Sequence, residues 1–237
     1  MRHRLLATTA LVTTCLGPLA AGCSGGGAKG VVKEYLNQKD CADRAKYILD
    51  AEKNKTLMLD YYKAKNVKQC VTEHKGVEEE DCEGKKNGEY CTVVAKGVDQ
   101  RYEVKKVGDS YKVDFRGTYG VGPVTVEALK AQWNAKLDPK DTPLRVRAKL
   151  DDAYFGRYSD LKDNYLSIRL EEPTGVGKLY GYVPRASPEG AALAKLLSDG
   201  KEHRLIVFVS YHPKTRSADE IEVMKVVQEG WRQRDDE

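Results

Sequence analysis

The spacing of apolar positions changes along this chain from a helical period to a period of two. Helical spacing begins at Val31 and recurs to about residue 62, whereas alternation starts at Tyr90. Strands are expected at residues 90–96, 101–107 and 110–115, separated by glycine-containing turns. We therefore predict an α+β N-terminal domain, in which helices precede a three-stranded antiparallel sheet. The apolar positions of the three expected helices are Val32, Tyr35 and Leu36, then Ala45, Ile48 and Leu49, then Leu57, Leu59, Tyr61 and Tyr62.

The second half of the chain predicts an all-β domain with one helix. A helix from about Thr125 to residue 138 precedes it, after a boundary rich in glycine at 117–123. The single helix inside the domain is expected from Ser187, the N-cap, with Pro188 in its first turn and Gly200 beyond its end. Alternating segments predict five strands, at residues 144 towards 158, 166–170, 179–183, 205–211 and 221–228.

The first residues have the pattern of an export signal. A basic start at residues 2–4 precedes apolar residues 5–20, a run too short to span a bilayer stably. The following Leu19-Ala20-Ala21-Gly22-Cys23 resembles the lipobox of bacterial lipoproteins, which implies removal of the signal and acylation of Cys23, with palmitate among the attached chains. The leucine lies four residues before the cysteine rather than the usual three. An uncleaved N-terminal anchor is the alternative.

These features divide the chain and suggest its location. Signal removal takes Arg2 and Arg4 and lowers the formal net charge from +4 to +2, which favours no nucleic-acid partner. The resemblance implies a cell-envelope protein held on the membrane by its lipid, and Ser24 after the cysteine favours the outer membrane, facing the periplasm. The expected parts are a signal peptide at 1–22, a Gly-rich tether at 23–30, the α+β domain at 31–117, a linker with a helix at 118–143, and the all-β domain at 144–237.

Four cysteines remain once Cys15 leaves with the signal and Cys23 takes lipid. An even number in an oxidising compartment predicts two disulfides. Of the three possible pairings we favour Cys41–Cys70 and Cys82–Cys91, because the second closes a loop with an Asn-Gly turn. A four-cysteine zinc site is the alternative, but the closely paired ligands that structural zinc normally uses are absent from the sequence.

Two family resemblances follow from the order of elements. Helices followed by a strand meander, ending in Val107-Gly108-Asp109-Ser110 and residues 111–115, resemble the small cystatin-like or NTF2-like domains of bacterial lipoproteins. Three strands, a helix and two strands resemble an OB-fold, a small Greek-key barrel. This second half is similar to the tRNA-anticodon-binding-like OB-fold lipoprotein group, a label that reflects shape and implies no RNA activity here.

One set of side chains points to binding. If apolar residues of the first three barrel strands face the core, the intervening polar and aromatic residues share the outer face. An ordinary half-solvated sheet is the alternative. Tyrosine and arginine suit a glycan, a peptide segment or an acidic patch of an envelope protein. The shared face comprises Arg145, Arg147, Lys149, Tyr165, Ser167, Arg169, Tyr180 and Tyr182, and the proposed binding residues are Arg145, Arg147, Tyr165, Arg169, Tyr180 and Tyr182.

Motifs for catalysis are weak in this sequence. Gly175-Val176-Gly177-Lys178 leads into a strand pattern rather than a helix, which is unlike a phosphate-binding loop. The acidic run Glu78-Glu79-Glu80-Asp81 is expected in a solvated turn, because it lacks the ligand spacing of a calcium loop. We predict a non-catalytic envelope protein with a binding or scaffolding role, without cofactor or metal. The alternatives are a small-molecule carrier with a pocket in the N-terminal domain and an envelope enzyme.

Overall fold

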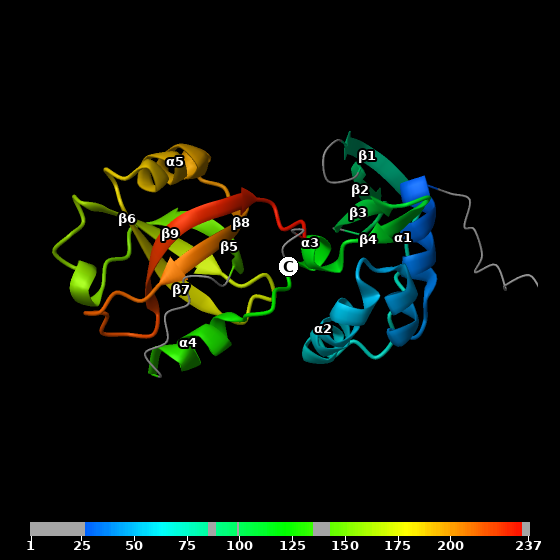
Figure 1. The fold of residues 1–237 in the computed structure, drawn as a ribbon, viewed down its shortest axis with the longest axis horizontal. Helices are drawn as coiled ribbons and strands as arrows, with labels where there is room; N and C mark the ends of the chain where they lie inside the picture. Colours follow the sequence, from blue (N-terminus) through cyan, green and yellow to red (C-terminus); the bar gives the residue numbers. More distant parts are fainter. Residues whose placement is uncertain (1–26, 85–88, 99, 135–142, 234–237) are drawn as a thin grey trace, which may run out of the picture.

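The computed structural model describes residues 27–84, 89–98, 100–134 and 143–233. The fold is mixed α+β: a four-stranded antiparallel sheet with helices, followed by a closed five-stranded barrel. Each part has a hydrophobic core of its own, one within residues 28–115 and the other within residues 126–223. Figure 1 shows the barrel on the left and the sheet with its helices on the right. Within the described ranges, no helix is both long and apolar enough to cross a membrane.

The N-terminal helices follow the predicted apolar spacing, with two differences. Gly27 to Gly30, expected in the tether, form the first turn of α1, where Ala28 is buried. The second expected helix is a short 3₁₀ helix, because the chain turns extended at Ile48, which bridges to Val113 of the sheet. The helices are α1 (Gly27–Asn37), η1 (Ala42–Tyr47) and α2 (Ala51–Ala64).

The N-terminal sheet has four strands, so the prediction of three is wrong. The acidic run expected in a solvated turn lies in β1, an edge strand paired only with β2. An edge strand accommodates charged side chains because one of its two long edges is unpaired and open to solvent. The Glu78 carboxylate pairs with the Lys96 ammonium at 2.5 Å. The strands are β1 (Val77–Gly84), β2 (Glu89–Ala95), β3 (Arg101–Val107) and β4 (Ser110–Val113), in that order.

Both favoured disulfides are present. Cys41–Cys70 joins the start of η1 to the segment that follows α2, and Cys82–Cys91 joins β1 to β2, where the two cysteines are directly paired. Glu79 lies close enough to Cys82 and Cys91 to suggest a metal site. The sulfur atoms of Cys82 and Cys91 are bonded to each other, so the two cysteines are not available as thiolate ligands.

Residues 117–123, the predicted boundary, are partly buried. Residues 115–118 are buried in the short helix α3 (Phe115–Tyr119), which Asp114 caps by accepting a 2.8 Å hydrogen bond from the Gly117 N–H. Gly120, with φ of 69°, ends this helix in the left-handed conformation, where Pro173 and Trp231 would overlap any added side chain. Helix α4 (Val126–Asn134) then precedes the barrel, and residues 135–142 of the expected linker lie outside the described residues.

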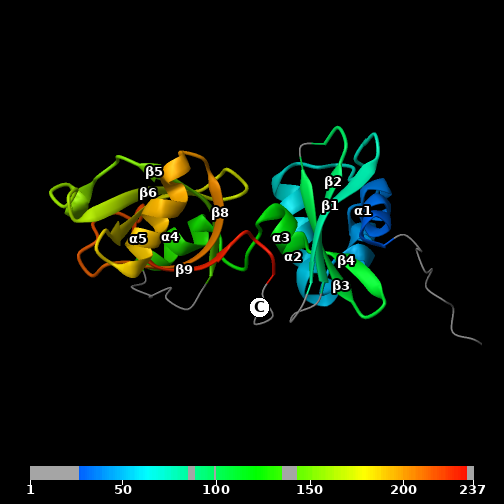
Figure 2. The same ribbon diagram turned by 90° about the horizontal axis from the view of Figure 1, so that it is seen from above.

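The barrel closes in the order β5-β6-β7-β9-β8, with β8 returning to β5. All its neighbours are antiparallel except β7 and β9. Helix α5 lies between β7 and β8 in the chain, as expected, and Figure 2 shows it in front of the barrel strands. Ser187 caps α5 by accepting from the Gly190 N–H, and Pro188 occupies its first turn. This topology is consistent with an OB-like barrel. The elements are β5 (Leu144–Asp151), η2 (Gly156–Tyr158), β6 (Tyr165–Glu171), β7 (Lys178–Pro184), α5 (Pro188–Leu196), η3 (Leu197–Asp199), β8 (His203–Ser210) and β9 (Glu220–Glu229).

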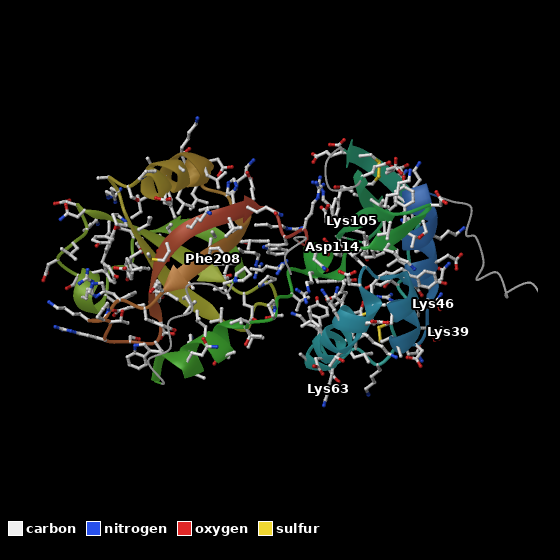
Figure 3. The ribbon with its side chains drawn as sticks, in the orientation of Figure 1. Lys39, Lys46, Lys63, Lys105, Asp114 and Phe208 are labelled. Carbon is white, nitrogen blue, oxygen red and sulfur yellow. A yellow bond between two sulfur atoms is a disulfide. The ribbon has the colours of Figure 1, made fainter. Side chains whose placement is uncertain are left out.

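The chain after β9 connects the barrel to the N-terminal sheet. The indole N–H of Trp231 donates to the Val146 carbonyl of β5 at 3.0 Å. Two residues later, Gln233 contacts Asp114, the residue before α3, and Asn54, which lies in α2. Figure 1 shows this red segment reaching α3, and Figure 3 labels Asp114 at the same junction. We call residues 230–233 the C-terminal clasp.

Candidate binding face of the barrel

The expected outer face of β5, β6 and β7 is only partly open. Arg145 is 2% exposed and Tyr182 is fully buried, so the expectation that both lie on an open face is wrong. Ser167 is buried as well, and Tyr165 is partly exposed. The face is covered at its two ends by different parts of the chain, which leaves its centre accessible.

The loop between β5 and β6 covers the first end. The Ser167 hydroxyl donates to the Ala153 carbonyl at 2.6 Å, and the Tyr182 hydroxyl donates to the same oxygen at 3.2 Å. The Phe155 N–H in turn donates to the Tyr182 hydroxyl at 3.3 Å. Tyr158 stacks on Tyr182 with ring centroids 3.8 Å apart, and Tyr165 meets Tyr158 edge-on. Burial raises the pKa of Tyr182 to about 12, so this hydroxyl stays protonated as a donor.

The C-terminal clasp covers the second end. The Arg145 guanidinium donates from Nε to the Trp231 carbonyl at 3.2 Å, and the Trp231 ring is buried against β5. Arg145 therefore takes part in attaching the clasp to the barrel. The clasp comes from a distant position in the chain and the β5–β6 loop has no strand period, so strand alternation alone could not place them.

The accessible centre contains the remaining predicted residues. Arg147 and Arg169 share two carboxylates: Glu171 lies 3.6 Å from Arg147 and 3.0 Å from Arg169, and Glu202 lies 3.7 Å from each. Lys149 lies directly opposite Arg169 across the β5–β6 pair. Among the residues that the structure describes, Lys149 makes no hydrogen bond or ion pair.

Like charges face each other twice on this surface. Besides Lys149 opposite Arg169, Arg147 lies opposite Arg204 across the β5–β8 pair. Like charges directly opposite in a sheet destabilise it. Burial lowers the pKa of Arg204, and Arg101 and Arg147 lower it further against the opposing effect of Glu103. The two like-charged pairs therefore cost the sheet stability, and Glu171, which lies opposite both Arg147 and Lys178, offsets part of that cost.

An aromatic pair adjoins the cations. Tyr180 lies directly opposite Arg169, and Phe155 meets the Tyr180 ring edge-on with centroids 4.8 Å apart. Phe155 is 46% exposed, and the Lys178 ammonium lies 4.7 Å from the Tyr180 centroid. Sequence reasoning missed Phe155 and Lys178; the available signal was the aromatic Tyr154-Phe155 pair in a turn between two strands. We call this surface the basic–aromatic face, made of Arg147, Lys149, Arg169, Lys178, Tyr180 and Phe155.

The side chains of the basic–aromatic face offer two kinds of interaction. Its cations can pair with carboxylates or phosphates, and its rings offer flat apolar contact. Comparison of the chain with protein-family models gave no match, and comparison with curated proteins gave none. Function is therefore inferred from the geometry of this face.

Proposed function

We propose that this protein is a non-catalytic, lipid-anchored protein of the cell envelope that binds an anionic partner through the basic–aromatic face. The observation that carries the proposal is the pair of like-charged cross-strand positions, Lys149 opposite Arg169 and Arg147 opposite Arg204. Only Glu171 and Glu202 form ion pairs with Arg147 and Arg169 among the described residues. Lys149 and Lys178 form no ion pair among the described residues, although Glu171 lies opposite Lys178 across the β6–β7 pair, so the four cations of the face outnumber the two carboxylates.

An OB-like identity of the barrel supports the position of the face. In OB-folds, ligands bind mainly across the second and third strands, which here are β6 and β7. Arg169 comes from β6, and Tyr180 and Lys178 come from β7. The basic–aromatic face thus coincides with the side of the barrel that this fold class uses for binding.

The proposed anchor rests on the lipobox-like residues 19–23, which lie outside the described residues. Acylation of Cys23 would place α1 close to the membrane surface, since α1 begins at Gly27. We propose the outer membrane, facing the periplasm, because Ser24 follows the cysteine. Several acyl chains bind a membrane much more firmly than one, at about 0.8 kcal/mol per buried methylene.

A carrier function receives less support from the N-terminal core. There the Arg44 guanidinium is buried, donates to the Tyr62 hydroxyl at 2.8 Å, and lies 4.5 Å from the Tyr35 ring centroid. The Tyr35 and Tyr62 hydroxyls are 2.6 Å apart. Burial raises the pKa of Tyr35 well above its usual value, so its hydroxyl stays protonated within this packed group of side chains. The interior that a carrier would need for its ligand is filled by these side chains.

Titration calorimetry with the mature chain tests the proposal, using two anionic probes: hexaglutamate and an oligogalacturonate. Lys149→Glu should weaken both complexes at least about tenfold, or 1.4 kcal/mol. Lys195→Glu, at an exposed position of α5, is the matched control and should bind as the unaltered chain does. Affinity should also fall as salt rises, because exposed charges are screened. Failure of both probes to bind, or equal affinities of the two variants, would contradict the proposal.

A further inference from the structure

Glu220 on β9 is buried without a hydrogen-bond partner for its Oε2 atom. The residue is 3% exposed, and in the described part of the chain no donor reaches that oxygen. Its neighbour Glu222 shows the contrast, since it accepts from the Tyr158 hydroxyl at 2.8 Å and faces Arg157 at 3.9 Å. A buried acceptor left unpaired is costly, so Glu220 requires an explanation.

The carboxylate of Glu220 adjoins the aromatic part of the basic–aromatic face. Glu220 is paired with Tyr180 across the parallel β7–β9 contact. Gly156 lies over the carboxylate with φ of 50°, and a Cβ there would overlap its oxygen atoms. Phe155, the preceding residue, packs on Tyr180. Gly156 is exposed, so a residue without a side chain lies between this carboxylate and the surface beside the two rings.

We infer that the anionic partner is an acidic oligosaccharide whose hydroxyl groups donate to Glu220, an inference that rests on the proposed function. An ionised carboxylate accepts hydrogen bonds and donates none, which suits the hydroxyl groups of a sugar. The rings of Phe155 and Tyr180 supply flat apolar contact for one face of a pyranose. The carboxylates of a uronic acid pair with Arg169, which lies opposite Tyr180 on β6, and with Lys149, which lies opposite Arg169 on β5. An acidic peptide satisfies the cations but brings no dense set of hydroxyl donors to Glu220.

Binding requires a small displacement of the backbone at Gly156. The β5–β6 loop is attached on either side of this residue, by the Ala153 carbonyl and by the ring of Tyr158. The movement is thus confined to the glycine and its neighbours. A methyl group at residue 156 would point into the carboxylate and block the approach of a hydroxyl.

The experiment compares Glu220→Gln with the matched control Glu222→Gln on the same strand. Calorimetry is performed on the mature chain with an oligogalacturonate, hexaglutamate and a neutral galactose oligomer. Glu220→Gln should weaken oligogalacturonate binding at least tenfold and change hexaglutamate binding less than twofold. Its thermal midpoint should not fall, because the Oε2 atom that the variant replaces has no hydrogen-bond partner to lose among the described residues. Glu222→Gln should keep oligogalacturonate binding while losing stability, because it weakens the contact to Tyr158.

The outcomes separate the two proposals. If Glu220→Gln binds oligogalacturonate as tightly as the unaltered chain, or melts at a lower temperature, the role of Glu220 is overturned. If hexaglutamate binds and oligogalacturonate does not, the sugar specificity is overturned while the proposed anionic partner stands. If neither probe binds, the proposed function falls together with this inference. Tight binding of the neutral oligomer would show that the cations are not needed and would overturn the acidic character of the sugar.

Discussion

The backbone N–H of Gln233 donates a 2.6 Å hydrogen bond to Oδ2 of Asp114, a residue 119 positions earlier in the chain. The other oxygen of the same carboxylate accepts from Gly117 at the start of α3. The Gln233 side chain continues the contact by accepting from Asn54 at 3.0 Å and donating to Asp50 at 2.7 Å. One buried carboxylate therefore holds the N-terminus of α3 and the C-terminal clasp together.

The burial of Asp114 should make this junction depend on pH. Burial raises the pKa of Asp114 to about 6, against the opposing hydrogen bonds from Gln233 and Gly117. Because the folded-state pKa is above the unfolded value of about 3.8, the folded state binds a proton more tightly. The contribution of Asp114 to stability is thus greatest below pH 4 and falls as pH rises through 6. At the upper limit the change is about 3 kcal/mol.

Urea unfolding of the unaltered chain and of Asp114→Asn between pH 4 and 7 measures this effect. The stability of the unaltered chain relative to the variant should decline over that range, since asparagine does not titrate. Asp43→Asn, at an exposed position of η1, should keep the pH dependence of the unaltered chain. Parallel curves for the unaltered chain and Asp114→Asn would show that Asp114 has no such shift.

Two neighbouring tyrosines of β7 should respond differently to truncation. Tyr182→Ala removes a buried ring that stacks on Tyr158 and should cost about 3–5 kcal/mol of unfolding free energy. Tyr180→Ala, at a partly exposed position, should cost under about 1 kcal/mol. Chemical denaturation of both variants checks the pair, and similar losses at the two positions would contradict the burial difference.

Removal of the disulfides should destabilise the N-terminal sheet and leave the barrel unchanged. Cys41→Ser with Cys70→Ser opens a loop with a sequence separation of 29. The loop-closure entropy predicts a loss of about 4 kcal/mol of unfolding free energy. Cys82→Ser with Cys91→Ser opens a separation of 9, worth about 3 kcal/mol. Hydrogen exchange measured separately for the strands of each part is the suitable readout. A matching loss of protection in β5–β9 would mean that the two parts unfold as one.

The lipobox-like segment predicts a change in membrane attachment. Cys23→Ala should leave the precursor unprocessed by the lipoprotein pathway and weaken its retention in membranes. Intact-mass spectrometry and membrane fractionation measure these outcomes, and Ser24→Ala serves as the control that keeps the cysteine. Loss of the same mass from Cys23→Ala as from the unaltered chain would contradict lipidation.

Local pattern was sufficient for the elements whose signals lie within a few residues. The Ser187-Pro188 start of α5, the alternation of β5 to β9 and the Cys82–Cys91 loop were all predicted from neighbouring residues, because caps, turns and strand periods are local properties. The edge strand β1 was missed because its acidic run has no apolar alternation. It forms through pairing with β2, which a single segment does not reveal.

Tertiary structure alone decided which side chains of the outer face remain accessible. Alternation correctly grouped Arg145, Arg169 and Tyr182 on one side of the sheet, but it carries no information on what covers that side. The β5–β6 loop buries Tyr182, and the clasp at Trp231 buries Arg145 from 86 residues away. Such long-range contacts depend on the folded path of the chain, so the sequence determined the strands and their facing, and the packing of distant segments determined the surface that is left for a partner.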